Sequence, residues 1–163
     1  MNKSDHERVL RVLNDYPNMM RKISILRYEL EHPTTVTPED MLEAMNYTHG
    51  DGGGVTSSTV SNKTLYIAMN YQYAAERANN EIRDQILARL LPLEQKIKRV
   101  DYYLGLLTEN EEMVLRRIYI EKMRLSETAA TMNISVWTAR RLRDKAVERL
   151  AEMVSFAEGD GWE

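Results

Sequence analysis

The chain has 163 residues, of which 43% are hydrophobic and 29% are charged, and this composition is typical of globular rather than disordered proteins. The absence of cysteine excludes disulfides and thiolate metal sites, and no stretch reads as a signal peptide or a membrane span, so we expect a cytoplasmic protein. The net charge of −3 does not exclude nucleic-acid binding, because phosphates respond to a local basic patch.

The first 32 residues predict helical structure with one break. Residues 5–32 carry apolar side chains at helical spacing, and we expect an interruption at Tyr16-Pro17 because proline suits the first turn of a new helix. Further on, Thr37-Pro38-Glu39-Asp40 combines a capping hydroxyl, a proline and two acids. This pattern predicts the start of a short helix that continues to Tyr47.

A glycine-rich loop interrupts the chain at residues 48–58. Four of the seven glycines lie there, so a phosphate-binding loop has to be considered. That motif needs glycine directly before Lys-[Ser/Thr], whereas Asn62 precedes Lys63 and Thr64 here. We therefore expect a flexible connector, or a loop that folds onto a partner, rather than a nucleotide site.

Residues 63–107 predict a long helical region. Its apolar residues follow the 4,3 spacing of a heptad seam, and Pro92 is expected to kink or divide the helix. The seam consists of Ile86, Leu90, Leu93, Ile97, Val100, Leu104 and Leu107. It could form a coiled coil in a homodimer, or it could pack on the N-terminal helices of the same chain.

The segment from Leu107 to Leu150 is the most informative part of the sequence. Thr108 and Glu111 form a capping-box pattern, and an apolar stripe at Val114, Leu115, Ile118 and Tyr119 follows. Ser126 is expected to cap a second helix over residues 127–132, and Asn133 can adopt the left-handed conformation of a tight turn.

A third helix is predicted to begin at Val136, capped by Ser135. Its inward face would consist of Ala139, Leu142, Ala146, Val147 and Leu150. Between Val136 and Arg149 there are five basic and two acidic side chains. With small Ala129 allowing the second and third helices to cross closely, this is the pattern of a helix–turn–helix whose last helix enters the major groove of DNA.

Arginine suits this task because its planar fork matches two acceptors on guanine or on phosphate. We expect Trp137, Thr138, Arg140 and Arg141 at base edges, and Arg124, Ser135, Arg143 and Lys145 nearer to phosphates. The candidate DNA-binding residues are Arg124, Ser126, Ser135, Val136, Trp137, Thr138, Arg140, Arg141, Arg143, Asp144 and Lys145. Trp137 could touch a thymine methyl group, or it could be buried in the core of its own domain.

Residues 107–150 resemble region four of bacterial sigma-70-type transcription factors. The matching residues are Leu107, Val114, Leu115, Tyr119, Glu127, Ala129, Ser135, Ala139, Arg140, Ala146 and Leu150. Asn133 stands where glycine is usual, and Ala139 stands where valine is usual. The chain has no counterpart of the sigma region that melts promoter DNA, so the resemblance does not imply a free-standing sigma factor.

The remainder of the chain resembles the phage and prophage late-transcription regulators of the ArpU/RinA type. The similarity is carried by the Tyr-Glu-Leu segment at 28–30, by Ser-Asn-Lys-Thr at 61–64, and by Ile67, Ala68 and Tyr71. This resemblance implies an activator of phage late genes that acts on double-stranded DNA with RNA polymerase, in the cytoplasm of a bacterial host.

The sequence as a whole predicts an all-α protein without an active site, a cofactor or a metal centre. We expect a helical N-terminal or oligomerisation region at residues 1–106, a helix–turn–helix domain at 107–157 and a tail at 158–163. His6, His32 and His49 share no metal-ligand spacing. Two other functions fit the same pattern: a small terminase-like subunit that packages DNA, and a protein-only adaptor of RNA polymerase.

Overall fold

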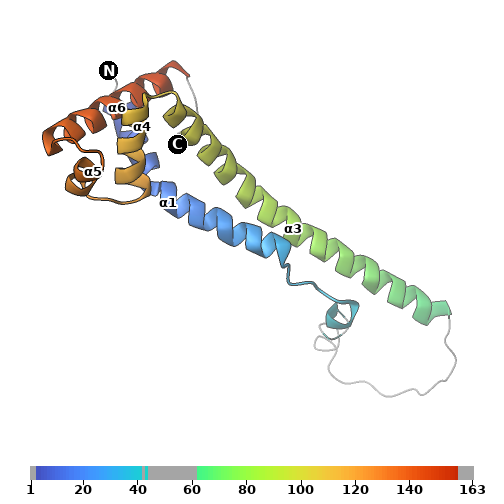
Figure 1. Cartoon of the computed structure of the whole chain (residues 1–163). Helices are drawn as coiled ribbons and strands as arrows, with labels where there is room; N and C mark the ends of the chain where they lie inside the picture. Colours follow the sequence, from blue (N-terminus) through green and yellow to red (C-terminus); the bar gives the residue numbers. More distant parts are fainter. Residues whose placement is uncertain (1–2, 42, 44–61, 158–163) are drawn as a thin grey trace. The chain divides into compact units, whose positions relative to one another are not determined.

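The computed structural model describes residues 3–41, 43 and 62–157, and over these residues the chain is all-helical, as predicted (Figure 1). Its elements are α1 (Lys3–Glu31), α3 (Asn62–Gly105), α4 (Glu109–Leu115), the π-helix η1 (Arg116–Ile120), α5 (Leu125–Thr131) and α6 (Val136–Phe156). The predicted glycine-rich loop and the tail lie outside the described residues. No helix in the described part of the chain has an apolar stretch long enough to cross a membrane.

The chain divides into two compact units. The first unit combines Met1–Ile25 with Leu90–Glu163, and the second is Leu26–Arg89. The first unit thus holds the whole helix–turn–helix segment together with the start of α1 and the end of α3. The predicted domain boundary near residue 107 stays a prediction.

In the second unit, the predicted helix start at Thr37 is confirmed. The Thr37 hydroxyl accepts a hydrogen bond from the Asp40 amide at 3.2 Å, and the Asp40 carboxylate accepts one from the Thr37 amide at 2.8 Å. The helix begins at Pro38, and most of its predicted continuation to Tyr47 lies outside the described residues. The preceding loop is fixed by Asn79, whose side chain bonds both the amide and the carbonyl of Val36, at 2.8 and 3.0 Å.

The two prolines predicted to interrupt helices do not do so. Both α1 and α3 are continuous, through Pro17 and Pro92 respectively. Each proline forfeits one backbone hydrogen bond. In α1, buried side chains precede and follow the proline at helical spacing, including Leu13 and Met19, so packing of the apolar face outweighs that loss. The predicted break at Tyr16-Pro17 and the division of the helix at Pro92 are therefore wrong. The alternative that Pro92 kinks α3 stays a prediction.

Most of the apolar seam of α3 is buried within a single chain. In the first unit, Leu90, Ile97, Val100 and Leu104 are all less than a tenth exposed. This burial supports packing inside the chain, the second of the two alternatives that the heptad spacing allows. The homodimer through the same residues stays a prediction.

Polar contacts tie α1 and α3 to the helix–turn–helix segment within the first unit. The buried Tyr16 hydroxyl donates to the Asp101 carboxylate at 3.1 Å, and the Arg116 guanidinium donates to the same carboxylate at 3.2 Å. Burial and the Asp101 charge raise the pKa of Tyr16, and Arg116 partly offsets this effect. Lys122 Nζ adds a bond to the carbonyl oxygen of Asn14 at 3.0 Å. The first part of α1, up to Ile25, is therefore an integral part of this unit.

Candidate nucleic-acid interface

Helix α6 begins where the sequence predicts. The Ser135 hydroxyl accepts a hydrogen bond from the Thr138 amide at 3.0 Å and so caps the first turn. The turn before it places Asn133 at a φ of 54°, in the left-handed region that asparagine tolerates. The Ile134 amide then bonds back to the carbonyl of Ala129 at 3.0 Å, which closes the turn between α5 and α6.

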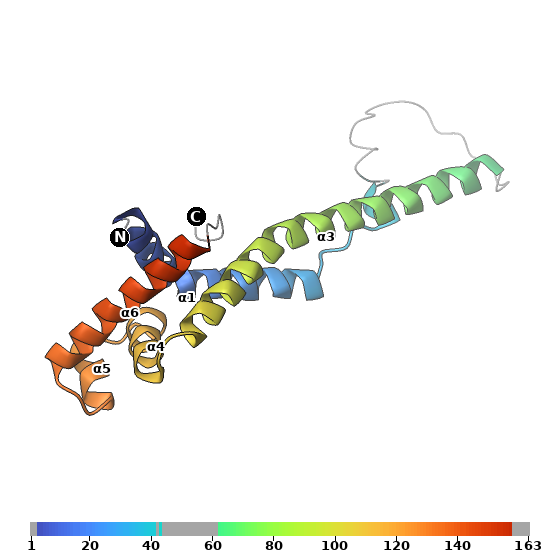
Figure 2. The same cartoon turned by 90° about the horizontal axis from the view of Figure 1, so that it is seen from above.

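Small residues allow α5 and α6 to pack closely. Ala129 on α5 and Ala139 on α6 are 1% and 0% exposed, and both helices lie against each other with α4 beside α6 in Figure 1 and Figure 2. Further along α6, Ala146, Val147 and Leu150 are also buried, as predicted, while Leu142 is half-buried. Burial of this face leaves the opposite face of α6 to solvent.

One ion pair connects α6 to α4. Arg149 donates to the carboxylate of Glu111 at 2.6 Å, and the Glu111 carboxylate also accepts the Thr108 amide at 3.3 Å, which is the predicted capping contact. Glu111 is 2% exposed. Burial alone would raise the pKa of Glu111, but the hydrogen bonds from Thr108 and Arg149 outweigh it and hold this pKa below its ordinary value. The charged pair thus fixes the orientation of α6.

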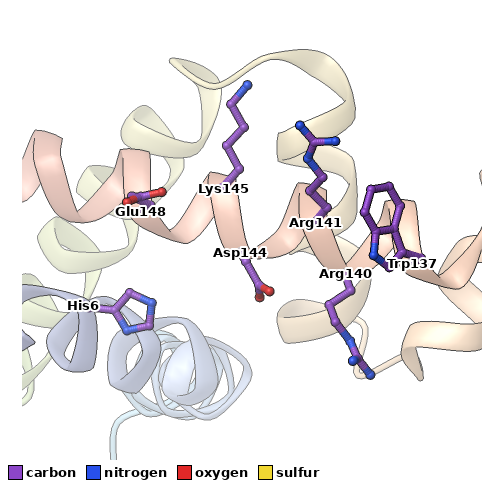
Figure 3. A pocket seen from close by; sticks show the side chains of 7 residues that line it. All are labelled: His6, Trp137, Arg140, Arg141, Asp144, Lys145 and Glu148. Atoms are coloured by element: carbon purple, nitrogen blue, oxygen red, sulfur yellow. The ribbon is translucent and has the colours of Figure 1, made fainter.

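An open hollow of about 630 Å³ lies along the exposed face of α6 (Figure 3). We call it the α6 hollow. It is lined by His6, Trp137, Arg140, Arg141, Asp144, Lys145 and Glu148. Five of these seven residues belong to the predicted DNA-binding set, and the spacing along one helix brings them to a common surface.

The cations of the α6 hollow are available to a partner. Arg140, Arg141 and Lys145 are exposed, and within the part of the chain that the structure describes they form no ion pair. The Arg141 guanidinium lies over the indole of Trp137, 5.5 Å from the ring centroid. Trp137 itself is 68% exposed, so the alternative that it fills the core of its own domain is wrong.

Arg143 differs from its basic neighbours. It is half-buried and donates to the Asp144 carboxylate through two nitrogen atoms, at 2.6 and 2.8 Å. Its charge also acts on Tyr119: burial raises the pKa of that hydroxyl, Arg143 lowers it and Asp144 raises it again. Arg143 and Asp144, both in the predicted DNA-binding set, therefore neutralise each other in this structure.

The two candidates on and before α5 stand apart from the α6 hollow. The Arg124 amide donates to the Glu127 carboxylate at 2.9 Å, so Arg124 is the N-cap residue of α5. Ser126 lies inside the first turn and is exposed. The prediction that Ser126 caps this helix is wrong. The Glu127 carboxylate accepts the amide of Arg124, so the N-cap residue is Arg124, two residues before Ser126.

The remaining candidates lie at the start of α6. Val136 is 46% exposed, and the Thr138 hydroxyl is 2.8 Å from that of Ser135, so the two hydroxyl groups form a pair. Glu148 and His6 are not among the residues predicted from the sequence to bind DNA. Glu148 follows Asp144 by one helical turn and could have been found from that spacing. His6 comes from α1, and no local sequence signal places it beside α6.

Two further features have no sequence signal. Residues 116–120 form a π-helix instead of a continuation of α4, and Lys122 has a φ of 58°. Lysine rarely adopts this conformation, and here the Lys122 side chain is held by the carbonyl of Asn14. Among the described residues, no group of three His, Cys, Asp or Glu side chains is arranged to hold a metal ion.

Comparison with known proteins identified a similarity over the helix–turn–helix segment. Residues 103–152, less than half of the chain, match the family model described as sigma-70, region 4. Neither the curated proteins nor the solved structures that were searched gave a match. The matched range covers the end of α3, α4, η1, α5 and most of α6. The chain therefore carries a helix–turn–helix domain similar to sigma-70 region 4, a type of domain that binds DNA in transcription and is not catalytic.

Proposed function

We propose that this protein is a sequence-specific regulator of transcription that binds double-stranded DNA through the first turns of α6. One observation carries the proposal: Arg140 and Arg141 are exposed and form no ion pair among the described residues, at the start of the last helix of a sigma region 4-like domain. A helix–turn–helix places this part of its recognition helix in the major groove.

The contacts follow from position along the helix. Arg140 and Arg141 lie on the first two turns and can reach base edges, together with Trp137 and Thr138. Lys145 lies one turn further on, where phosphates are the nearer partners. Ser135 at the start of α6 and Arg124 at the start of α5 are both exposed and would also contact phosphates. Arg143 would have to exchange Asp144 for a phosphate, so we expect it to contribute less.

The finer assignment is to an activator of phage late genes that works with the RNA polymerase of a bacterial host. It is supported by the resemblance of residues 28–30, residues 61–64, Ile67, Ala68 and Tyr71 to the ArpU/RinA-type regulators. The sigma region 4-like domain supports it as well, since sigma factors act on RNA polymerase. The packaging subunit and the protein-only adaptor remain the competing functions.

The proposed function is tested by selecting binding sites for the full chain from random duplex DNA, and by footprinting the selected sequence. We expect one enriched motif and a protected region on that duplex. Light scattering of the protein then separates the alternatives. In light scattering, a large ring would favour a packaging subunit. In the selection, a failure to enrich any duplex at low salt would favour the adaptor.

A further inference from the structure

Two apolar side chains are exposed side by side at the start of α6. Val136 is 46% exposed and Trp137 is 68% exposed, and both belong to the first helical turn. Trp137 is a large side chain that can bury about 150–250 Å² against a partner, so its exposure leaves much apolar surface in water. In a helix–turn–helix, this turn is the part of the recognition helix that comes nearest to the bases.

Arg141 holds the indole in place. It follows Trp137 by one helical turn, and its guanidinium lies 5.5 Å from the ring centroid (Figure 3). A cation over the face of a tryptophan is attracted by the ring electrons. The contact occupies one face of the indole, restrains its rotation and leaves the rest of the ring accessible.

The charge around this apolar pair identifies its partner. Arg140, Arg141 and Lys145 line the same hollow as Trp137, together with the carboxylates of Asp144 and Glu148, of which Asp144 is paired with Arg143. An apolar protein surface docked there would have to cover these charges, and the three cations outnumber the one carboxylate that has no such pairing. The major groove of DNA offers phosphates to the cations and, between them, one apolar projection at base level. That projection is the C5-methyl group of thymine, and 5-methylcytosine carries the same group.

We propose that Trp137, with Val136 beside it, reads the C5-methyl group of a pyrimidine in the major groove. The inference rests on the proposed function and deepens it: one position of the binding site is recognised by an apolar contact instead of a hydrogen bond. Removing a single buried methyl group should weaken binding about fourfold. Replacing the indole should abolish that difference.

The test uses the full chain and a duplex carrying its selected sequence. Each thymine of the site is replaced in turn by deoxyuridine, which lacks only the methyl group, and each cytosine by 5-methylcytosine. Affinities are measured for the unaltered protein and for Trp137→Ala. Phe156→Ala is the matched control, because Phe156 is an aromatic residue of α6 that is 92% exposed at the far end of the helix.

We expect one pyrimidine position at which removal or addition of the methyl group changes affinity about fourfold. Trp137→Ala should bring this ratio close to one, while Phe156→Ala should leave it unchanged. The deoxyuridine and 5-methylcytosine replacements together show whether the recognised methyl group belongs to thymine or to 5-methylcytosine. An affinity insensitive to the methyl group at every position, or a full methyl effect in Trp137→Ala, overturns the inference.

A further measurement distinguishes this mode from base stacking. With Trp162→Phe, Trp137 becomes the single tryptophan, and its fluorescence should change on adding the duplex. A larger change with the single strand than with the duplex would mean that the indole stacks on unpaired bases, and would also overturn the inference. If no duplex sequence is enriched in the selection, the proposed function fails instead, so the two failures are distinct.

Discussion

At the scale of single residues, the structure separates side chains that look alike in the sequence. Arg140, Arg141 and Arg143 are close neighbours on one basic helix. The first two are exposed toward the α6 hollow, whereas Arg143 is half-buried and paired with Asp144. Helical spacing predicted which face of α6 is buried. It could not predict the pairing of Arg143, because an arginine has several staggered conformers and only the packed structure selects one.

Arg140 and Lys145 are expected to contribute to binding in different ways. Arg140→Ala should cost about 1–3 kcal/mol of binding free energy at one base position and relax specificity there. Lys145→Ala should weaken binding to all duplexes alike and reduce the salt dependence by about one phosphate contact. Affinities of both variants for the selected site and for single-base variants of it test this difference. Equal losses on every duplex for both variants would contradict the assigned roles.

Glu111 makes the stability of the domain sensitive to acid. Its pKa is lowered in the folded protein, so the carboxylate contributes stability above its ordinary pKa and loses it as the pH falls through the lower, folded value. We expect Glu111→Gln to reduce the free energy of unfolding by about 1–3 kcal/mol at neutral pH. The difference from the unaltered protein should shrink on acidification below about pH 4. Urea unfolding across this range measures it, and a difference independent of pH would contradict the expectation.

At the scale of elements, capping patterns predicted a helix start correctly where no neighbouring residue offers an alternative cap. Thr37, Thr108 and Ser135 each precede a helix as expected. The signal failed at Ser126, because Glu127 instead bonds the amide of Arg124. The expected interruptions of α1 at Pro17 and of α3 at Pro92 did not occur. A proline costs one backbone hydrogen bond, and the sequence alone does not show how much apolar burial compensates for that loss.

Two serines near the turn provide a matched pair of variants. Ser135→Ala removes the hydroxyl that accepts the Thr138 amide and should lower the free energy of unfolding by about 1 kcal/mol. Ser126 is exposed and lies inside the first turn of α5, so Ser126→Ala should change the free energy of unfolding by less than about 0.5 kcal/mol. Chemical denaturation compares the two. A larger loss for Ser126→Ala would restore that serine as the cap of α5.

At the scale of the whole molecule, the helix–turn–helix segment does not stand alone in the first unit. The start of α1 supplies Tyr16, which bonds Asp101, and the carbonyl of Asn14, which binds Lys122. The all-α class and the seam of α3 could be predicted from periodicity. The joining of residues 1–25 to the C-terminal part could not, because contacts between residues about a hundred positions apart leave no periodic signal in one sequence.

This joining predicts that a core substitution in α1 destabilises the helix–turn–helix segment. Leu13 is 0% exposed, so Leu13→Ala should lower the free energy of unfolding by about 2–5 kcal/mol. Hydrogen exchange of the α6 amides should accelerate in parallel, because both elements belong to one compact unit. Leu91→Ala is the control, since Leu91 is 49% exposed. Unchanged exchange in α6 would show that the segment folds independently of α1.

The most direct test of the central claim compares the affinity of the full chain for its selected duplex with that for a duplex of the same composition in scrambled order, at one fixed salt concentration. If the exposed guanidinium groups of Arg140 and Arg141 read base edges, the selected duplex should bind at least about a thousandfold more tightly, and replacing both arginines by alanine should remove most of that ratio. Equal affinity for the two duplexes, or a ratio unaffected by the double substitution, would contradict the claim.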